Sequence, residues 1–262
     1  MAVKTLRFAV AGLAVLLTAS LAACGGKTDD STGSALATSG SAGGAVTVFA
    51  AASLTESFTT LGKQFESANP GSTVTFNFGG SSALATQINE GAPADVFASA
   101  SPKNMQVVTD AGTPTTFVKN QLVIAVAKGN PKGITGLADL TKADLKVALC
   151  AEAVPCGAAA KTAIEAAGVK VTPVTLEQDV KAALSKVKLG EVDAALVYRT
   201  DAKASAADVD AVEFPESAKA INDYPITVLK SAKNAAGGQA FVDYVLSAEG
   251  TKVLTEAGFQ AP

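Results

Sequence analysis

Two serines in this sequence stand at the same kind of turn. Ser53 in "VTVFAAASLTESF" (46–58) and Ser81 in "FGGSSALATQI" (78–88) each follow a strand-like stretch and precede residues with helical spacing. A serine at a helix start can cap it by accepting a hydrogen bond from an N–H of the first turn. Alternatively, a turn of small residues leaves room for an anion on those N–H groups, which lack partners within the helix. The local pattern favours the cap, and both interpretations stay open at this stage.

The residues that are missing restrict the chemistry. The chain has no histidine, which excludes histidine-dependent acid–base catalysis and histidine metal ligands. Its only arginines are Arg7 and Arg199, so no site can hold a carboxylate or phosphate with several guanidinium groups. A ligand must therefore be held mainly by backbone N–H groups, hydroxyls, lysines or carboxylates.

An enzyme is the main alternative to a binding protein. A nucleophilic Ser53 or Ser81 needs an adjacent base, and without histidine only a lysine could serve. Neither serine is followed by lysine in an S-x-x-K arrangement, so we predict no enzymatic activity. The chain has no tryptophan, low aromatic content and scattered tyrosines, which disfavours sugar and ferric-iron sites. With a net charge of −3 and no basic patch, nucleic acid is not an expected partner.

The elements that position these residues alternate between strands and helices. Strands are predicted at 46–49, 73–78, 94–100, 121–128, 146–150, 193–198 and 224–229, and the chain closes with helices near 236–247 and 249–256. This alternation predicts an α/β fold with parallel sheets covered by helices on both faces. Ligands of such sheets sit beyond the carboxyl ends of the strands. Ser53, Ser81, the turn at Cys156 and Tyr198 all fall at such ends.

The first 24 residues resemble a bacterial lipoprotein leader. Lys4 and Arg7 precede an apolar core at 8–19, and "LAAC" ends at Cys24. The resemblance implies a signal peptide over 1–23, acylation of Cys24 and a lipid anchor on the outward face of the cell membrane. A plain signal peptide or a short membrane anchor is the alternative. Residues 24–44, rich in Gly, Ser, Ala and Thr, are predicted to form a flexible tether.

Longer motifs resemble one known family. "VTVFAAASLTESF", "FGGSSALATQINEGAPADVFASA", "VPCGAAAK", "EQDVKAAL" and "ALVYRTDA" are similar to the periplasmic molybdate-binding proteins of ABC importers. The resemblance implies a two-lobed periplasmic-binding-protein fold of type II, in which each lobe is a mainly parallel sheet flanked by helices and the ligand lies in the interlobe cleft. We expect one lobe at 45–126 plus 225–262 and the other at 127–224. The chain would cross between them near Val126–Lys128 and Asp223–Ile226.

The resemblance also implies a function and partners. The protein is expected to bind molybdate or tungstate, without a cofactor or any metal beyond that oxyanion. Another tetrahedral oxyanion such as sulfate is the alternative ligand. The expected partner is an ABC transporter permease, and the expected state is a monomer.

The ligand set follows from the same resemblance. Ser53 and Ser81 would bind through hydroxyl and backbone N–H, Cys156 and Val180 through backbone N–H, and Tyr198 through its hydroxyl. Without the resemblance, Tyr198 would be expected to pack in the core, and Val180 would be an ordinary apolar helix residue. The family usually has a small residue such as alanine in place of Cys156, and residues that are often hydroxylated in place of Gly79 and Gly80. Asp179 is expected to cap the helix that follows it, and Arg199 is not assigned to the site.

Cys150 and Cys156 are the remaining thiols once Cys24 is acylated. An even pair in an exported domain predicts a disulfide that closes a short loop. Two free thiols, or a redox or metal pair, are the alternatives, and metal is disfavoured without histidine or further cysteines.

Overall fold

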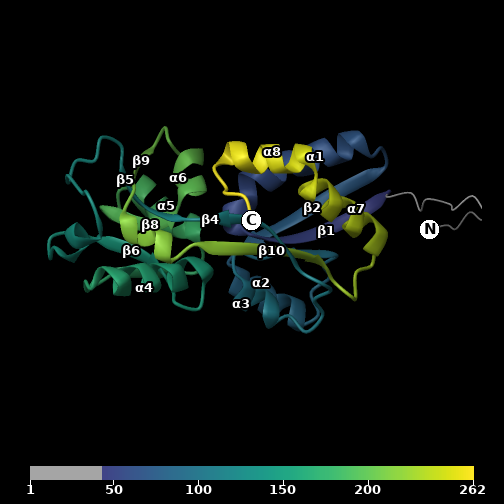
Figure 1. The fold of residues 1–262 in the computed structure, drawn as a ribbon, viewed down its shortest axis with the longest axis horizontal. Coiled ribbons are helices and arrows are strands. Elements are labelled where there is room, and N and C mark those ends of the chain that lie inside the picture. The colour runs from purple at the N-terminus through teal and green to yellow at the C-terminus, as the bar shows by residue number, and fades with distance from the viewer. Residues whose placement is uncertain (1–42) are drawn as a thin grey trace, which may run out of the picture. The chain divides into compact units, whose positions relative to one another are not determined.

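The computed structural model describes residues 43–262 (Figure 1). The predicted signal peptide (1–23), the predicted lipid acceptor Cys24 and all but the end of the predicted tether lie outside the described residues. Gly44, the last residue of that tether, already begins the first strand, because it pairs with Ser72. Within the described part of the chain, no helix combines the length and apolar character needed to cross a membrane.

One five-stranded sheet, with the order β2–β1–β3–β10–β4, and its helices form what we call lobe I. Its strands are β1 (Gly44–Ala51), β2 (Ser72–Gly79), β3 (Val96–Ala98), β4 (Thr115–Asn120) and β10 (Asn222–Val228). Helices α1 (Thr55–Ala68), α7 (Ala235–Leu246) and α8 (Ala248–Ala257) lie on one face, and α2 (Ser81–Asn89) and α3 (Pro102–Gln106) lie on the other (Figure 1). A short 3-10 helix, η1 (Ala52–Leu54), joins β1 to α1.

A second five-stranded sheet, with the order β7–β6–β8–β5–β9, and its helices form lobe II. Its strands are β5 (Leu122–Ala127), β6 (Val147–Cys150), β7 (Thr175–Glu177), β8 (Ala194–Tyr198) and β9 (Val209–Val212). Helix α4 (Pro155–Ala167) lies on one face, and α5 (Val180–Lys188) and α6 (Arg199–Ala204) lie on the other (Figure 1). Two 3-10 helices, η2 (Leu137–Thr141) and η3 (Pro215–Lys219), lie in the connections.

Both sheets are mixed, whereas the sequence predicted mainly parallel ones. In lobe I, β1 runs parallel to β2 and β3, but β10 runs antiparallel to β3 and β4. In lobe II, β6 runs parallel to β7 and β8, but β5 runs antiparallel to β8 and β9. The exceptions, β5 and β10, are the strands that follow a passage from the other lobe. Each of these strands joins its sheet directly from the other lobe, without the crossover helix that a parallel neighbour requires, and it therefore runs antiparallel.

The chain passes between the sheets at two places. It leaves lobe I at Gln121, between β4 and β5, and it returns between Val212 and Asn222 by way of η3. The predicted crossings differ from these. Val126–Lys128 lies at the end of β5, which pairs with β8 from Leu122 onward, and Asp223–Ile226 lies inside β10.

Each lobe buries its own core. The core of lobe I is aromatic: Phe58 and Phe65 meet Phe241 of α7 edge-on, with ring centroids 6.0 and 5.5 Å apart. The core of lobe II is mostly aliphatic and is centred on strands β5 and β8, in which every residue except Ala127 is buried. Ala52 of lobe I packs into this second core, so the two lobes are in apolar contact beside η1.

Candidate functional site

A pocket between the lobes contains all five residues predicted as ligands. Ser53 in η1 and Ser81 at the start of α2 come from lobe I, while Cys156 in α4, Val180 at the start of α5 and Tyr198 at the end of β8 come from lobe II. The empty volume of the pocket is about 200 Å³, part of it open to solvent. The other residues lining it are Ala52, Gly79, Gly80, Ala100, Val154, Pro155 and Asp179. The turns that follow the strands thus come together at one pocket, as predicted. The role of each residue as a ligand stays a prediction.

Neither serine caps a helix. Helices η1, α1 and α2 all begin without a side-chain cap. Ser53 Oγ instead lies 2.8 Å from the hydroxyl of Tyr224, and Ser81 Oγ accepts a 2.9 Å hydrogen bond from the backbone N–H of Ala100. The cap interpretation is therefore wrong. The first N–H groups at the start of α2 have no side-chain acceptor, which leaves them free to hold an anion.

Tyr198 brings an unpaired hydroxyl to the pocket. Its ring is 1% exposed and packs edge-on against Tyr224 from the other lobe, with centroids 5.9 Å apart. Among residues 43–262, its Oη has no hydrogen-bond partner. Burial, and next the proximity of Tyr224, raise the pKa of Tyr198 well above its usual value, so the hydroxyl keeps its proton. An unpaired buried donor costs about 1–3 kcal/mol, and in a pocket it points to a ligand.

Lobe II meets the pocket with helix starts. Pro155 is the first residue of α4 and has no N–H, so the first N–H of that helix belongs to Cys156. Val180 is the first residue of α5, and the carboxylate of Asp179 caps this helix by accepting a 2.9 Å hydrogen bond from the N–H of Ala182. The prediction for Asp179 is confirmed, because its carboxylate serves its own helix.

The predicted disulfide is present. Cys150 at the end of β6 is bonded to Cys156 in the first turn of α4, with Cα atoms 5.8 Å apart. The loop between them is tight, since a Cβ added to Gly157 would lie 2.0 Å from the carbonyl oxygen of Ala151. The disulfide therefore fixes the backbone that carries the Cys156 N–H.

Gly80 explains one departure from the family pattern. A Cβ on this residue would lie 2.3 Å from the carbonyl oxygen of Gln178 in lobe II. The backbones of the two lobes thus approach each other too closely for any larger residue at this position. At Gly79, by contrast, an added Cβ would meet only Leu84, at an ordinary distance of 3.6 Å.

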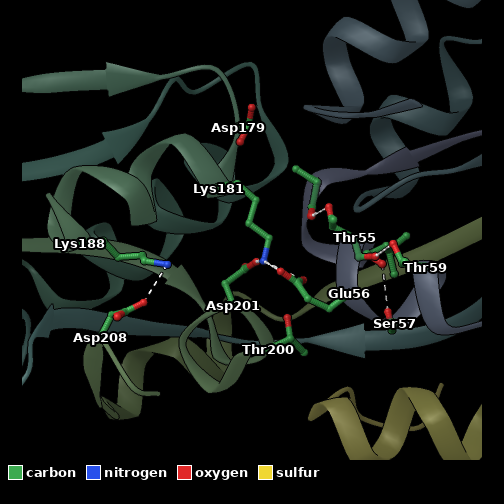
Figure 2. Close-up of polar contacts among 12 residues, drawn as sticks. Thr55, Glu56, Ser57, Thr59, Asp179, Lys181, Lys188, Thr200, Asp201 and Asp208 are labelled. Atoms are coloured by element: carbon green, nitrogen blue, oxygen red, sulfur yellow. Dashed lines mark hydrogen bonds and ion pairs between the residues drawn. The ribbon is translucent and has the colours of Figure 1, made fainter. Parts of the chain in front are cut away.

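An ion-pair network beside the pocket was not anticipated from the sequence. Lys181 of α5 reaches across to Glu56 of α1, with Nζ–Oε1 2.7 Å, and also lies 3.0 Å from Oδ1 of Asp201 (Figure 2). Asp201 is fully buried, and burial raises its pKa to about 6 although Lys181 opposes the shift. Burial lowers the pKa of Lys181, but the charges of Asp201 and Glu56 outweigh it, so that pKa is raised. The sequence offered one indication that Lys181 lies near the pocket, because it directly follows the predicted ligand Val180.

Arg199 is not among the residues that line the pocket. Its guanidinium donates two hydrogen bonds of 2.9 Å to the carboxylate of Glu213. Among the described residues, no group of three or more His, Cys, Asp and Glu side chains is arranged to hold a metal ion.

Two α/β lobes, two chain crossings and a small donor-lined pocket between the lobes define a solute-binding protein of the two-lobed class. The family model described as bacterial extracellular solute-binding protein matches residues 46–260. The chain belongs to this family.

Individual relatives narrow the comparison. The molybdate-binding protein ModA of Mycobacterium tuberculosis (strain H37Rv) is 44% identical over 256 residues, covering 95% of this chain and 96% of the relative. Among solved structures, the periplasmic molybdate-binding protein of Azotobacter vinelandii has a TM-score of 0.72 at 20% identity, covering 83% of this chain and 99% of that one. The sulfate-binding protein SubI of M. tuberculosis has a TM-score of 0.69 at 17% identity, covering 83% and 86%. Both structures share the fold.

Proposed function

We propose that this protein binds molybdate or tungstate in the pocket between its lobes and delivers the ion to an ABC importer. The observation that carries the proposal is the set of donors around the pocket. It comprises the hydroxyls of Ser53, Ser81 and Tyr198 and the first N–H groups of α4 and α5. Helix starts carry the positive end of the helix dipole, so an oxyanion can be held there without an opposing charge. Every oxygen of a deprotonated oxyanion accepts hydrogen bonds.

The identity of the anion rests on the relatives and on size. The mycobacterial relative that is 44% identical over nearly the whole chain is named a molybdate-binding protein, which favours molybdate and the similarly sized tungstate. Sulfate is the second candidate, since a sulfate-binding protein shares the fold. Sulfate is smaller, and donors spaced for molybdate would leave its hydrogen bonds stretched. Binding rather than catalysis is the proposed role, because the hydrogen-bond partners of Ser53 and Ser81 among the described residues are the Tyr224 hydroxyl and the Ala100 N–H, and neither is a general base.

Delivery requires the lobes to open. We propose that they move about the crossings at Gln121 and 213–221, which replace the crossings predicted from sequence. Ser53 and Ser81 would then separate from Cys156, Val180 and Tyr198 on opening. The protein is proposed to act as a monomer that is anchored to the outward face of the cell membrane by lipid on Cys24 and docks on a permease.

Titration calorimetry with a panel of oxyanions tests the proposal. We expect tight and similar binding of molybdate and tungstate, much weaker binding of sulfate and the weakest binding of phosphate. Incubation with ester and phosphoester substrates should release no product. Failure to bind molybdate, or sulfate binding as tight as molybdate binding, would contradict the assignment.

A further inference from the structure

Behind Ser53 lies a second layer of polar groups that does not line the pocket. Tyr224 of β10 is fully buried, and its hydroxyl lies 2.8 Å from Ser53 Oγ. Either oxygen could be the donor in that pair. The direction decides whether Ser53 offers a proton or a lone pair to the pocket, because a hydroxyl has one proton only.

The side chain of Asn120 settles the direction. Its Oδ1 accepts a 2.9 Å hydrogen bond from the backbone N–H of Gln121, which fixes the orientation of the amide. Its Nδ2 therefore faces the other way, 2.9 Å from Thr200 Oγ1 and 3.5 Å from the Tyr224 hydroxyl. An amide nitrogen donates and does not accept. Asn120 thus gives Tyr224 no acceptor for its proton.

Ser53 Oγ, 2.8 Å away, is the acceptor placed for that proton, because the neighbouring Tyr198 hydroxyl makes no hydrogen bond of normal geometry with the described residues. If Ser53 donated to Tyr224 instead, the Tyr224 proton would be buried without an acceptor, at a cost of a kind that folded proteins avoid. The chain of hydrogen bonds consequently runs from Asn120 to Tyr224 and from Tyr224 to Ser53. The Ser53 proton is then left to point into the pocket.

The Ser81 hydroxyl is also free to donate into the pocket, for a different reason. Its Oγ accepts from the backbone N–H of Ala100, which can only donate, so its own proton is also free for the pocket. The Tyr198 hydroxyl has no partner among the described residues. All three hydroxyls can therefore donate to the same ligand.

We propose that Tyr224 is a positioning residue that acts through Ser53 and commits the Ser53 hydroxyl to donation, which disfavours a protonated oxyanion on this side of the pocket. The proposal rests on the proposed function and names a determinant of its specificity. A hydrogen phosphate ion must donate its proton to some acceptor, and turning Ser53 to accept would leave the Tyr224 proton unpaired. Molybdate, which carries no proton near neutral pH, meets donors at Ser53, Ser81 and Tyr198, while the carboxylate of Asp179, which also lines the pocket, is engaged as the cap of α5.

Tyr224→Phe is the first test, because it keeps the ring and removes the donor. We expect molybdate binding about 3- to 10-fold weaker in calorimetry, since the Ser53 hydroxyl loses its orientation and its polarising partner. In a Ser53→Ala background, the same change should alter Kd less than about twofold, because Tyr224 has lost the group through which it acts. The matched control is Tyr244→Phe, which breaks a 3.3 Å hydrogen bond to Gln64 on the surface, and it should bind like the wild type.

Asn120→Asp is the second test, because it replaces the donor facing Tyr224 by an acceptor. The Tyr224 proton can then turn to the carboxylate, and Ser53 can accept from the ligand. Both molybdate and hydrogen phosphate carry two negative charges at mildly alkaline pH, so repulsion by the new charge weakens both alike. The ratio of phosphate to molybdate affinity should rise at least about tenfold.

The outcomes separate the two proposals. A wild-type protein that binds no oxyanion overturns both. A wild-type protein that binds molybdate while Tyr224→Phe changes nothing, or weakens binding equally with and without the Ser53 hydroxyl, overturns the role of Tyr224 alone. An unchanged phosphate-to-molybdate ratio in folded Asn120→Asp protein, with folding checked by thermal melting, also overturns it.

Discussion

The two sides of the pocket present hydrogen-bond donors in different ways. Lobe I supplies the hydroxyls of Ser53 and Ser81, and each is hydrogen-bonded from behind, Ser53 to the Tyr224 hydroxyl and Ser81 to the N–H of Ala100. Lobe II supplies the start of α4, fixed by a disulfide, and the start of α5, capped by Asp179. A hydroxyl rotates and needs a partner to fix its direction, whereas a backbone N–H points where the chain sends it. The difference shows that donors to one ligand can be oriented either by hydrogen bonds to their side chains or by a fixed backbone.

The largest loss of ligand affinity is expected from a change at Gly80, where the backbones of the two lobes meet. Gly80→Ala would place a Cβ 2.3 Å from the carbonyl oxygen of Gln178, so the lobes could not close to the distance seen here. Gly80 has φ −62 and ψ 131, which alanine adopts freely, and lobe I should fold normally. We expect molybdate binding to weaken roughly 100-fold or more, from the upper end of overpacking costs. Gly79→Ala is the matched control, because its Cβ meets only ordinary contacts.

Calorimetry would measure both variants, with circular dichroism to verify folding. Affinities within a few-fold of each other would show that closure does not depend on this approach of the two backbones.

Removing single hydroxyls should have the next largest effect. Ser53→Ala, Ser81→Ala and Tyr198→Phe each delete one hydrogen bond to a charged ligand, worth about 1.5–3 kcal/mol. The expected loss in affinity is roughly 10- to 150-fold for each, and binding should persist because the backbone donors remain. Wild-type affinity in all three variants would place the ligand elsewhere.

The disulfide should matter less for affinity than for stability. Replacing both Cys150 and Cys156 by alanine removes the closed loop, and we expect the free energy of unfolding to fall by about 2 kcal/mol because the loop is short. Molybdate binding should weaken by less than about tenfold, since the N–H of residue 156 is retained. Urea titrations with and without reductant measure the first effect. The double variant must be indifferent to reductant, and mass spectrometry of unreduced wild-type protein should show the linked peptides.

The last prediction concerns Asp201 and the pH dependence of stability. Its pKa is about 6 in the folded protein and about 3.9 in an unfolded chain, so between these values the folded state binds more protons. The free energy of unfolding should therefore decrease as pH rises from about 4 to about 6, by at most about 1.4 kcal/mol per pH unit from this group. Asp201→Asn should lack this component. The difference between the two stability curves isolates it, and parallel curves would contradict the raised pKa.

Local patterns predicted the elements, and long-range pairing decided the rest. The turns at Ser53, Ser81 and Cys156 could be placed because an apolar run, a small turn and a helical period lie within a dozen or so neighbouring residues. The apolar stretch 121–128 was recognised as a strand, but nothing local says which sheet it joins, and the predicted crossing was therefore displaced. The mixed character of the sheets has the same origin.

The pocket residues could be predicted from local sequence motifs, whereas the groups behind them could not. Ser53 and Tyr198 lie in motifs shared with a family, whereas Tyr224 and Asn120 carry no local signal of their role. Tyr224 meets Ser53 across 171 positions of the sequence, and Lys181 meets Glu56 across 125. Contacts of this kind appear only once the sheets are assembled.

The pairing of Tyr198 with Tyr224 has a spectroscopic consequence. The chain contains no tryptophan and three tyrosines, so excitation at wavelengths that phenylalanine does not absorb gives intrinsic ultraviolet emission from tyrosine alone. Two of those three rings pack edge-on between the lobes, with centroids 5.9 Å apart, and one of them, Tyr198, lines the pocket. A ligand that contacts the Tyr198 hydroxyl or draws the lobes together acts directly on these emitters. The protein thus carries a built-in optical probe at its pocket, and the third tyrosine, Tyr244, provides a background that Tyr244→Phe removes.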